Sequence, residues 1–542
     1  MYILPLLLLF ACEPTEKVDL IVHNAKVYTV NDAFETAEAF VVDNGEIIAV
    51  GAENEILNKY LAKEYLDAQK RPVFPGFIDA HCHFVGYAKS LLQVNLVGTS
   101  SFDGVLEKVV TFSKENSIEW IEGRGWDQND WDIKEFPNKE KLDILFPNRP
   151  VFLRRVDGHA AIANQKALDI ANIDLTTQIN GGIIEKKNNQ LTGILIDNAV
   201  DLVMNVIPQP NENTLTEAII KAQQNLFEVG LTTVDDAGLD QFEIEYLEKL
   251  DTQGILKLNI YAMISARPEL FNYYLEKGPF KTNHINVSSF KFYADGALGS
   301  RGACLLEPYS DIIEQEQFGL MIELKEFYEK YAPLLYQKGF QMNTHCIGDS
   351  ANRMILNIYK NVLKGTNDKR WRIEHAQVIN DKDFEIFAQY NIIPSVQPTH
   401  ATSDMYWAKD RLGEIRLKNA YAYKKLLQQN GLIALGTDFP VEGINPLNTF
   451  YAAVARKDSK GYPENGFNPE NALTREEALK GMTIWAAIAN FEENEKGSLE
   501  VGKKADFIVL DNDIMETKEN EILNTKVLET YINGEKVFSG GK

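Results

Sequence analysis

The chain has 542 residues, of which 55 are Lys or Arg and 78 are Asp or Glu, and its formal net charge at pH 7 is −23. This acidic balance argues against nucleic acid as a partner, because DNA and RNA binding depends on basic residues that neutralise phosphates. The composition, 45% hydrophobic and 25% charged, is typical of a soluble globular protein, and four cysteines are too few for a disulfide-based fold.

The first residues have the pattern of a secretion signal. Residues 2–11 are almost wholly apolar, and Cys12 follows them in a run that resembles a bacterial lipoprotein processing site, where the cysteine carries a lipid. The run is shorter than the roughly 20 apolar residues of a membrane-spanning helix. We expect residues 1–12 to be a signal segment that leaves the protein in the bacterial cell envelope, with a lipid on Cys12 as its only membrane contact. The alternative is an N-terminal strand or tail.

Short β-like runs occur near both ends of the chain. Residues 18–72 contain LIVHNAKVYTV, AFVVDNG and EIIAVG, and residues 496–542 contain ADFIVLD and ETYINGEKVF. Gly, Asn and Asp turn residues bound each run. Because the two stretches bracket a larger body, we expect them to pair into one composite β-sandwich.

Residues 73–490 alternate strand-like runs with amphipathic stretches, which is the pattern of a parallel (β/α)8 barrel. A long segment from about 84 to 207 does not fit a barrel turn, and we expect it to be an insertion after the first strand, folded over the barrel mouth. A capping box at residues 474–477 predicts a late helix. The eight strand candidates are VFPGFIDAH, LTTVDDAG, KLNIYAMI, SSFKFYADG, QMNTH, WRIEHAQ, NIIPSVQP and LIALGTD.

Candidate metal ligands occur at the ends of five of these strands. His81 and His83 follow the first strand and, by the alternation of side chains along a strand, share one face, whereas Cys82 points away. Because the strands of a parallel barrel end at the same mouth, the later residues should converge on this pair. Four imidazoles and a carboxylate suit a Zn²⁺-like ion better than Mg²⁺ or Ca²⁺. The later residues are Lys291, His345, His375 and Asp438.

Several motifs together resemble the metal-dependent amidohydrolase superfamily, in particular its family 3, the YtcJ-like branch that includes N-substituted formamide deformylases. The resemblance covers nearly everything after the signal segment. It implies a distorted (β/α)8 TIM barrel with a composite β-sandwich. The motifs are PGFIDAHCH, GRGWDQNDW, RVDGHAAIAN, FKFYADGALGSRGA, THCIGD, RIEHAQ, GTDFPV and GSLEVGKKADFIVLD.

The resemblance also implies a role for each candidate ligand. His81 and His83 would bind a first divalent metal ion, and His345 and His375 a second, with zinc as the expected metal. Asp438 would bind the first ion and act as general base. Lys291 would react with CO₂ to give a carbamate that bridges both ions, since an unmodified ammonium would be repelled there. The alternative for Lys291 is a structural lysine paired with Asp295.

The implied reaction is cleavage of a C–N amide bond, other than a peptide bond, in a small N-acyl or N-formyl amine or amino acid. A metal-bound hydroxide would attack the carbonyl carbon, and Asp438 would pass the proton to the leaving amine. The sequence contains no G-x-S-x-G motif that would favour a serine hydrolase. It leaves the oligomeric state open.

Substrate-binding candidates come from the family motifs and from residue chemistry. Arg301 follows the fourth strand, and a guanidinium binds carboxylates through two hydrogen bonds; a structural ion pair of Arg301 with Asp295 or Glu307 is the alternative. Trp126 is equally compatible with packing of the insertion. The remaining candidates are Asp127, Asp157 and His159 in the insertion and His400 after the seventh strand.

Two other functions remain open from the sequence. A mononuclear deaminase of the same superfamily would use one ion and a carboxylate base soon after the strand-five histidine, where Asp349 stands, and it would leave Lys291 without a role. An inactive, lipid-anchored binding protein could keep the same fold, although a decayed site would be expected to have lost some ligands.

Overall fold

The computed structural model describes residues 16–115, 119–208, 210–312 and 314–540. The predicted lipidation site, Cys12, lies outside these residues. Within them, no helix is both long enough and apolar enough to cross a membrane.

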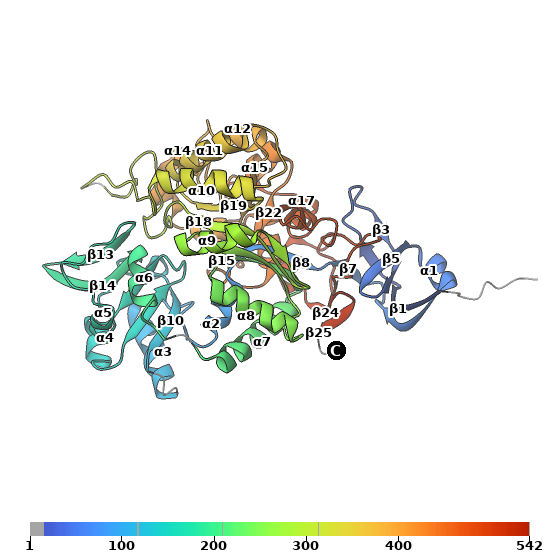
Figure 1. The fold of residues 1–542 in the computed structure, drawn as a ribbon, viewed down its shortest axis with the longest axis horizontal. Coiled ribbons are helices and arrows are strands. Elements are labelled where there is room, and N and C mark those ends of the chain that lie inside the picture. The colour runs from blue at the N-terminus through green and yellow to red at the C-terminus, as the bar shows by residue number, and fades with distance from the viewer. Residues whose placement is uncertain (1–15, 116–118, 209, 313, 541–542) are drawn as a thin grey trace, which may run out of the picture.

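Eight parallel strands form a nearly closed barrel at the centre of the molecule (Figure 1). The barrel closes at its mouth, where the Asp438 N–H donates to the His81 carbonyl over 2.7 Å and the His83 N–H donates to the Phe439 carbonyl over 2.8 Å. In order around the barrel, the strands are β8 (Phe77–Cys82), β15 (Leu231–Leu239), β16 (Asn259–Ser265), β18 (Ile285–Tyr293), β19 (Gln341–Cys346), β20 (Arg372–His375), β21 (Ile393–Val396) and β22 (Ala434–Leu435). Each of the eight predicted runs contributes a barrel strand, although the first does so only in part.

Alternation of side chains separates the two faces of the barrel strands. On β18, Phe290 and Phe292 pack into the large apolar core that also contains helix residues, whereas Lys291 is oriented into the barrel, where its Nζ atom contacts His81. The helices of this body are α2 (Phe84–Ser90), α7 (Glu212–Glu228), α8 (Gln241–Thr252), α9 (Pro268–Lys277), α10 (Lys325–Lys338), α11 (Asp349–Leu363), α12 (Phe384–Gln389), α13 (Pro398–Asp404), α14 (Ala408–Leu417), α15 (Tyr423–Asn430), α16 (Pro446–Ala455), α17 (Arg475–Gly481) and α18 (Ile484–Ala489). The short strand β17 (Phe280–Lys281) pairs with β18, and η2 (Pro469–Asn471) and η3 (Glu519–Asn524) are single 3₁₀ turns. The predicted capping box is present at the start of α17.

The insertion after the first barrel strand folds around its own six-stranded sheet and lies beside the barrel in Figure 1. The β10 and β11 strands are parallel neighbours near the middle of this sheet. Its strands are β9 (Val94–Asn95), β10 (Ile121–Trp126), β11 (Val151–Arg155), β12 (Ala160–Ala163), β13 (Gly182–Lys187) and β14 (Gln190–Asp197). Its helices are α3 (Phe102–Glu115), α4 (Glu140–Leu145), α5 (Gln165–Ile170) and α6 (Asn198–Met204), with a 3₁₀ turn η1 (Gln128–Asp130).

Two sheets at the opposite side of the barrel form the sandwich. One contains only N-terminal strands: β5 (Glu46–Gly51), β4 (Ala39–Asp43), β1 (Glu16–His23) and β6 (Tyr60–Asp67), with α1 (Glu53–Lys59) beside them. The other joins both ends of the chain: β25 (Glu535–Ser539), β24 (Val527–Ile532), β23 (Phe507–Leu510), β7 (Pro72–Pro75), β2 (Lys26–Tyr28) and β3 (Thr36–Ala37). The predicted fold class, a distorted TIM barrel with a composite sandwich and an insertion, is confirmed.

One predicted strand divides between two sheets. VFPGFIDAH was expected to be a single barrel strand, but Val73 and Phe74 pair with β23 in the sandwich and only Phe77–Cys82 enters the barrel. The chain changes sheets at Gly76, where a Cβ atom would lie 2.3 Å from the Thr232 side chain. This close approach requires glycine, and it explains why one apolar run serves two sheets.

We predict that Phe507→Ala destabilises the sandwich. The ring is fully buried, stacks on Tyr531 at 4.2 Å between centroids and meets Phe40 edge-on at 5.0 Å. Removal of a buried aromatic ring leaves a cavity that costs about 3–5 kcal/mol. Urea denaturation followed by tryptophan fluorescence and circular dichroism would measure the loss. Val501→Ala, at an exposed position in the same region, is the control, and equal midpoints for the two variants would contradict the packing.

Candidate metal centre and active site

Most of the predicted functional residues line one cavity of about 1090 Å³ at the carboxyl ends of the barrel strands. Both the barrel mouth and the insertion line this cavity, so the insertion completes a site that the barrel alone would leave open. His81 lies beneath it and contacts Lys291, which is part of the wall. The other predicted residues in the wall are His83, Asp127, Asp157, His159, His345, His375, His400 and Asp438.

His81, His83 and Asp438 meet where the barrel closes. Asp438 Oδ1 is 3.7 Å from His81 Nε2 and 3.1 Å from His83 Nε2. The other ring nitrogens are already engaged: His81 Nδ1 is 2.6 Å from Glu374 Oε2, and His83 Nδ1 is 2.8 Å from the Ala237 carbonyl oxygen. Since these oxygens only accept hydrogen bonds, each Nδ1 carries the proton and each Nε2 presents a lone pair toward Asp438.

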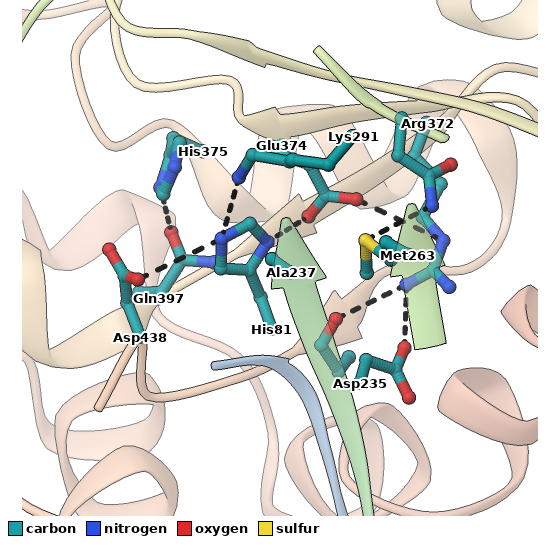
Figure 2. A network of polar contacts seen from close by, with 12 residues as sticks. His81, Asp235, Ala237, Met263, Lys291, Arg372, Glu374, His375, Gln397 and Asp438 are labelled. Atoms are coloured by element: carbon teal, nitrogen blue, oxygen red, sulfur yellow. Dashed lines mark hydrogen bonds and ion pairs between the residues drawn. The ribbon is translucent and has the colours of Figure 1, made fainter. Parts of the chain in front are cut away.

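The Nδ1 side of the His81 ring contacts Glu374, which belongs to a buried polar network with Arg372 and Asp235 (Figure 2). Arg372 Nη1 lies 2.8 Å from Asp235 Oδ2, and Arg372 Nε lies 4.0 Å from Glu374 Oε1. Burial raises the pKa of Glu374, but His81, Arg372 and Lys291 outweigh it, so the net shift is downward and the carboxylate is ionised. Burial lowers the pKa of His81 to about 4, so its imidazole is neutral at pH 7, the form that binds metal ions.

Three further histidines lie next to one another in the wall of the same cavity. The ring centroids of His345 and His375 are 4.6 Å apart, and those of His375 and His400 are 5.9 Å apart. His375 Nδ1 lies 2.6 Å from the Gln397 side-chain oxygen, which fixes its ring orientation. Burial lowers the pKa of both His345 and His375 well below the usual range, so these imidazoles are also neutral.

The backbone turns two of the candidate ligands into the cavity. Along β20, Arg372 and Glu374 point into the barrel, so simple alternation would direct His375 outward, as it does for its neighbour in register, Cys346. His375 instead has φ of 71°, and Asp438 has φ of 62°. Left-handed conformations of non-glycine residues cost roughly 1–3 kcal/mol each and collect at functional sites.

Lys291 is buried in the middle of this cluster. Its Nζ atom lies 2.9 Å from His81 Nε2 and 4.9 Å from the centroid of the Tyr293 ring. Burial lowers the pKa of Lys291 to about 8. The alternative partner, Asp295, is occupied elsewhere: its carboxylate accepts hydrogen bonds from the backbone N–H groups of Cys304, Ile347 and Gly348 over 2.7, 2.9 and 2.8 Å.

The donor atoms of the cluster fit a divalent metal ion. Ligand atoms lie within 4.8 Å of one another in two groups that share Asp438: His81 with His83, and His375 with His400. Asp438 Oδ1, His345 Nε2 and His400 Nε2 are buried without a hydrogen bond. Buried polar atoms without partners are rare unless an ion or ligand satisfies them, and imidazole with carboxylate is a zinc-type donor set.

The insertion brings three predicted residues to the cavity wall. His159 Nδ1 is 2.7 Å from Asp197 Oδ1, and the His159 ring lies 5.1 Å from that of His345. Asp127 and Asp157 both pair with the buried guanidinium of Arg155. These two carboxylates therefore hold the insertion loops in place beside the cavity.

Two predicted substrate contacts lie away from the cavity. Trp126 is only 1% exposed and packs in the insertion's own apolar core, where its Nε1–H donates to the Leu153 carbonyl over 2.8 Å. Arg301 pairs with Asp311 over 2.9 Å and not with Asp295 or Glu307. Packing of Trp126 and a structural ion pair for Arg301 were the alternatives expected from the sequence, but Asp311 could not be identified as the partner because that contact depends on how the loops pack.

Three contacts in the site are not among the sequence predictions. Glu374 and Gln397 orient His81 and His375, and His400, a predicted substrate contact, also joins a candidate ligand group with Asp438. A carboxylate directly before a metal-ligand histidine, as in Arg-Ile-Glu-His, is the one available signal for Glu374. Metal-bound imidazoles usually donate their second N–H to such a group.

A comparison with known protein families now places the chain. The model of the amidohydrolase family matches residues 64–538. The chain belongs to the amidohydrolase family. The resemblance inferred from the sequence motifs is therefore confirmed, and so is its reading as a metal-dependent hydrolase.

The similarity of this amidohydrolase to individual relatives covers almost its whole length. It is 31% identical over 529 residues to the putative amidohydrolase YtcJ of Bacillus subtilis, covering 95% of this chain and 98% of that protein. It is 26% identical over 548 residues to N-substituted formamide deformylase of Arthrobacter pascens, covering 96% and 98%. A solved structure of an uncharacterized metal-dependent hydrolase from Pyrococcus horikoshii matches with a TM-score of 0.75 and 27% identity, covering 92% of this chain and 99% of that one.

We predict that Glu374→Gln weakens metal binding by this amidohydrolase without unfolding it. The amide keeps the size of the side chain but removes the charge that polarises His81 Nδ1–H, and loss of such a partner typically costs 10–100-fold in metal affinity. Competition with a chromogenic chelator would measure the change. The same substitution at exposed Glu385 on α12 is the matched control, and unchanged affinity in Glu374→Gln would contradict the role.

Proposed function

We propose that this amidohydrolase cleaves the C–N bond of a small N-acyl or N-formyl amine or amino acid in a metal-dependent reaction. The observation that carries the proposal is Asp438, a buried carboxylate shared by two histidine groups with one oxygen free of hydrogen bonds. The name of the Arthrobacter relative, a formamide deformylase, supports a bond of this type.

The residues around Asp438 define the parts they can take. A bound zinc-like ion supplies polarisation of the amide carbonyl and a lowered pKa for water. Asp438 lies at the cavity wall, where it can accept a proton from an attacking water molecule and hold it for the leaving nitrogen. His81 and His83 form one candidate ligand group with this carboxylate, and His375 and His400 form a second, so an ion bound in either group would fix its position.

The finer metal chemistry is part of the same proposal. Two zinc ions would share the six candidate ligands, with Lys291 carboxylated by CO₂. The pKa of about 8 that burial gives Lys291 supports this, because a carbamate forms from the neutral amine. Its Nζ atom lies 2.9 Å from His81 Nε2, and this proximity to a candidate ligand also supports the proposal. Isotopically labelled bicarbonate and carbon NMR would detect the carbamate, and its absence from fully active protein would exclude it.

We also propose that a lipid on Cys12 anchors the enzyme in the bacterial cell envelope. The support is the apolar run that precedes Cys12. Mass spectrometry of protein purified from a bacterial host would detect the lipid, and the Cys12→Ser variant would release the enzyme from the membrane fraction. An unmodified Cys12 in the wild type would contradict the anchor.

Metal removal and return test the function as a whole. We predict that protein stripped by a chelator loses amine release from a panel of N-formyl and N-acyl amines and regains it with zinc, at about two ions per chain in the presence of bicarbonate. One ion with ammonia release from aminopurines would favour the deaminase. Full metal occupancy with no turnover of either panel would favour a binding protein.

Replacement of the proposed base gives a sharper outcome. We predict that Asp438→Asn lowers kcat by roughly 10²–10⁴-fold, the range for loss of a general base, because an amide neither accepts the proton nor offers a charged ligand. Metal content must be measured alongside the rate to separate these two effects. Exposed Asp381→Asn is the control. Retention of most of the activity in Asp438→Asn would rule out this role.

A further inference from the structure

Two arginines stand next to each other in the cavity wall formed by the insertion. Arg124 on β10 and Arg154 on β11 are partners in register on parallel strands, and both line the cavity that contains Asp438. Side chains at paired positions project to the same face of a sheet, so the two guanidinium groups share one part of the wall.

Neither of these arginines has a carboxylate partner in the part of the chain that the structure describes. Arg124 Nη2 donates to the Val156 carbonyl over 3.0 Å, and its Nε is buried without a hydrogen bond. Arg154 Nη2 donates to the Gln93 side-chain oxygen over 3.3 Å. Most of the ten N–H groups that two guanidiniums carry therefore have no partner among the described residues.

The next residue shows how this chain treats an arginine that serves structure. Arg155 is 2% exposed and pairs with two carboxylates, those of Asp127 and Asp157, and with the Gln128 side chain. Its charge is fully compensated where it packs. Arg124 and Arg154 repel each other and have no such compensation, which is costly unless an anion joins them.

The surroundings of Arg124 leave space for a ligand and bring it near the reacting centre. Gly158 has φ of +78°, and a Cβ atom there would lie 3.2 Å from Arg124 Nη2, so glycine leaves room for the guanidinium. Arg124 and Asp438 line the same cavity. Burial and the neighbouring Arg154 lower the pKa of Arg124, Asp438 and Asp157 oppose the shift, and the net value of about 9 leaves Arg124 charged at neutral pH.

We propose that Arg124 and Arg154 bind a carboxylate group of the amide substrate. The inference rests on the proposed function and narrows its substrate class to acylated amines that carry an acid, such as acylated amino acids. A planar guanidinium presents two parallel N–H groups that match a carboxylate, and the second arginine balances the remaining charge. Burial lowers the pKa of Arg154, and Glu122, which lines the same cavity, opposes this shift. Glu122 therefore offsets part of the charge of Arg154, so Arg124 contributes more.

The test compares two ligands that differ only in charge. The probes are the ketomethylene analogues of N-acetylleucine and of N-acetylleucinamide, in both enantiomers, in which a CH₂ group replaces the amide N–H and prevents hydrolysis. Leucine suits the apolar wall formed by Leu92, Val97 and Trp120. Calorimetry with the metal-loaded full chain should show the acid binding at least roughly tenfold more tightly than the amide, in line with a charge-assisted pair.

Variants assign this preference to the two arginines. Arg124→Met should weaken binding of the acid by at least roughly tenfold and leave the amide within about twofold, Arg154→Met should have a smaller effect, and Arg124→Lys should be intermediate because it keeps the charge but loses the paired geometry. Arg353→Met on α11, which breaks only a pair with Asp383, is the control. An acid that binds no better than its amide in the wild type, or a preference that survives in Arg124→Met, would overturn the inference.

Hydrolysis separates this inference from the proposed function. If the enzyme hydrolyses neutral and acidic amides equally well, it is a C–N hydrolase and the carboxylate site is wrong. If the acid analogue binds through Arg124 but no amide in the panel is hydrolysed, the carboxylate site stands and the proposed reaction fails.

Discussion

A buried hydrogen bond between Glu374 and His81 is the interaction on which the candidate metal centre depends. It lies where water does not reach, so the carboxylate must be balanced by protein charges, and Arg372 and Lys291 are placed to do so. Arg372 is in turn balanced by Asp235, which accepts a further hydrogen bond from Asn490. The barrel interior therefore contains paired charged side chains as well as packed apolar ones. The hydrogen bond orients the imidazole before any metal or substrate arrives. Burial and Lys291 keep the imidazole neutral, although Glu374 on its own favours the protonated form.

The barrel and the insertion contribute different parts of the site. The barrel supplies Lys291, Asp438 and all the candidate imidazoles except that of His159, from its strands and from the segments that follow them, with left-handed turns at His375 and Asp438. The insertion supplies the facing wall, with His159 above His345 and the two arginines beyond. The chemistry thus lies on rigid strands, whereas the features that would select among substrates lie on a separate sheet. A change of substrate within the family could proceed through the insertion without disturbing the metal ligands.

The barrel could be predicted from the sequence because its strands are short apolar runs separated by amphipathic helices, and the candidate ligands because each stands at the end of such a run. The alternation of side chains along a strand was enough to predict that His81 and His83 share one face. Other contacts carry no local signal. Nothing near Arg301 distinguishes Asp311 as its partner, and Trp126 sits in a motif whose polar neighbours suggested a pocket although its ring packs inward. Gly76 divides one apolar run between two sheets because of an approach to Thr232, a residue more than a hundred positions away.

The composite sandwich has a consequence for how the molecule is made. The strand β7 is hydrogen-bonded to β23, and Phe40 packs on Phe507, so residues from the start of the chain find their partners only in its last segment. During synthesis the apolar face that contains Leu20, Val22 and Phe40 stays uncovered while some 450 further residues leave the ribosome. Contacts of such long range form slowly, because the loop they close is large. The nascent protein is therefore most exposed to aggregation, and most dependent on chaperones, through its N-terminal sheet.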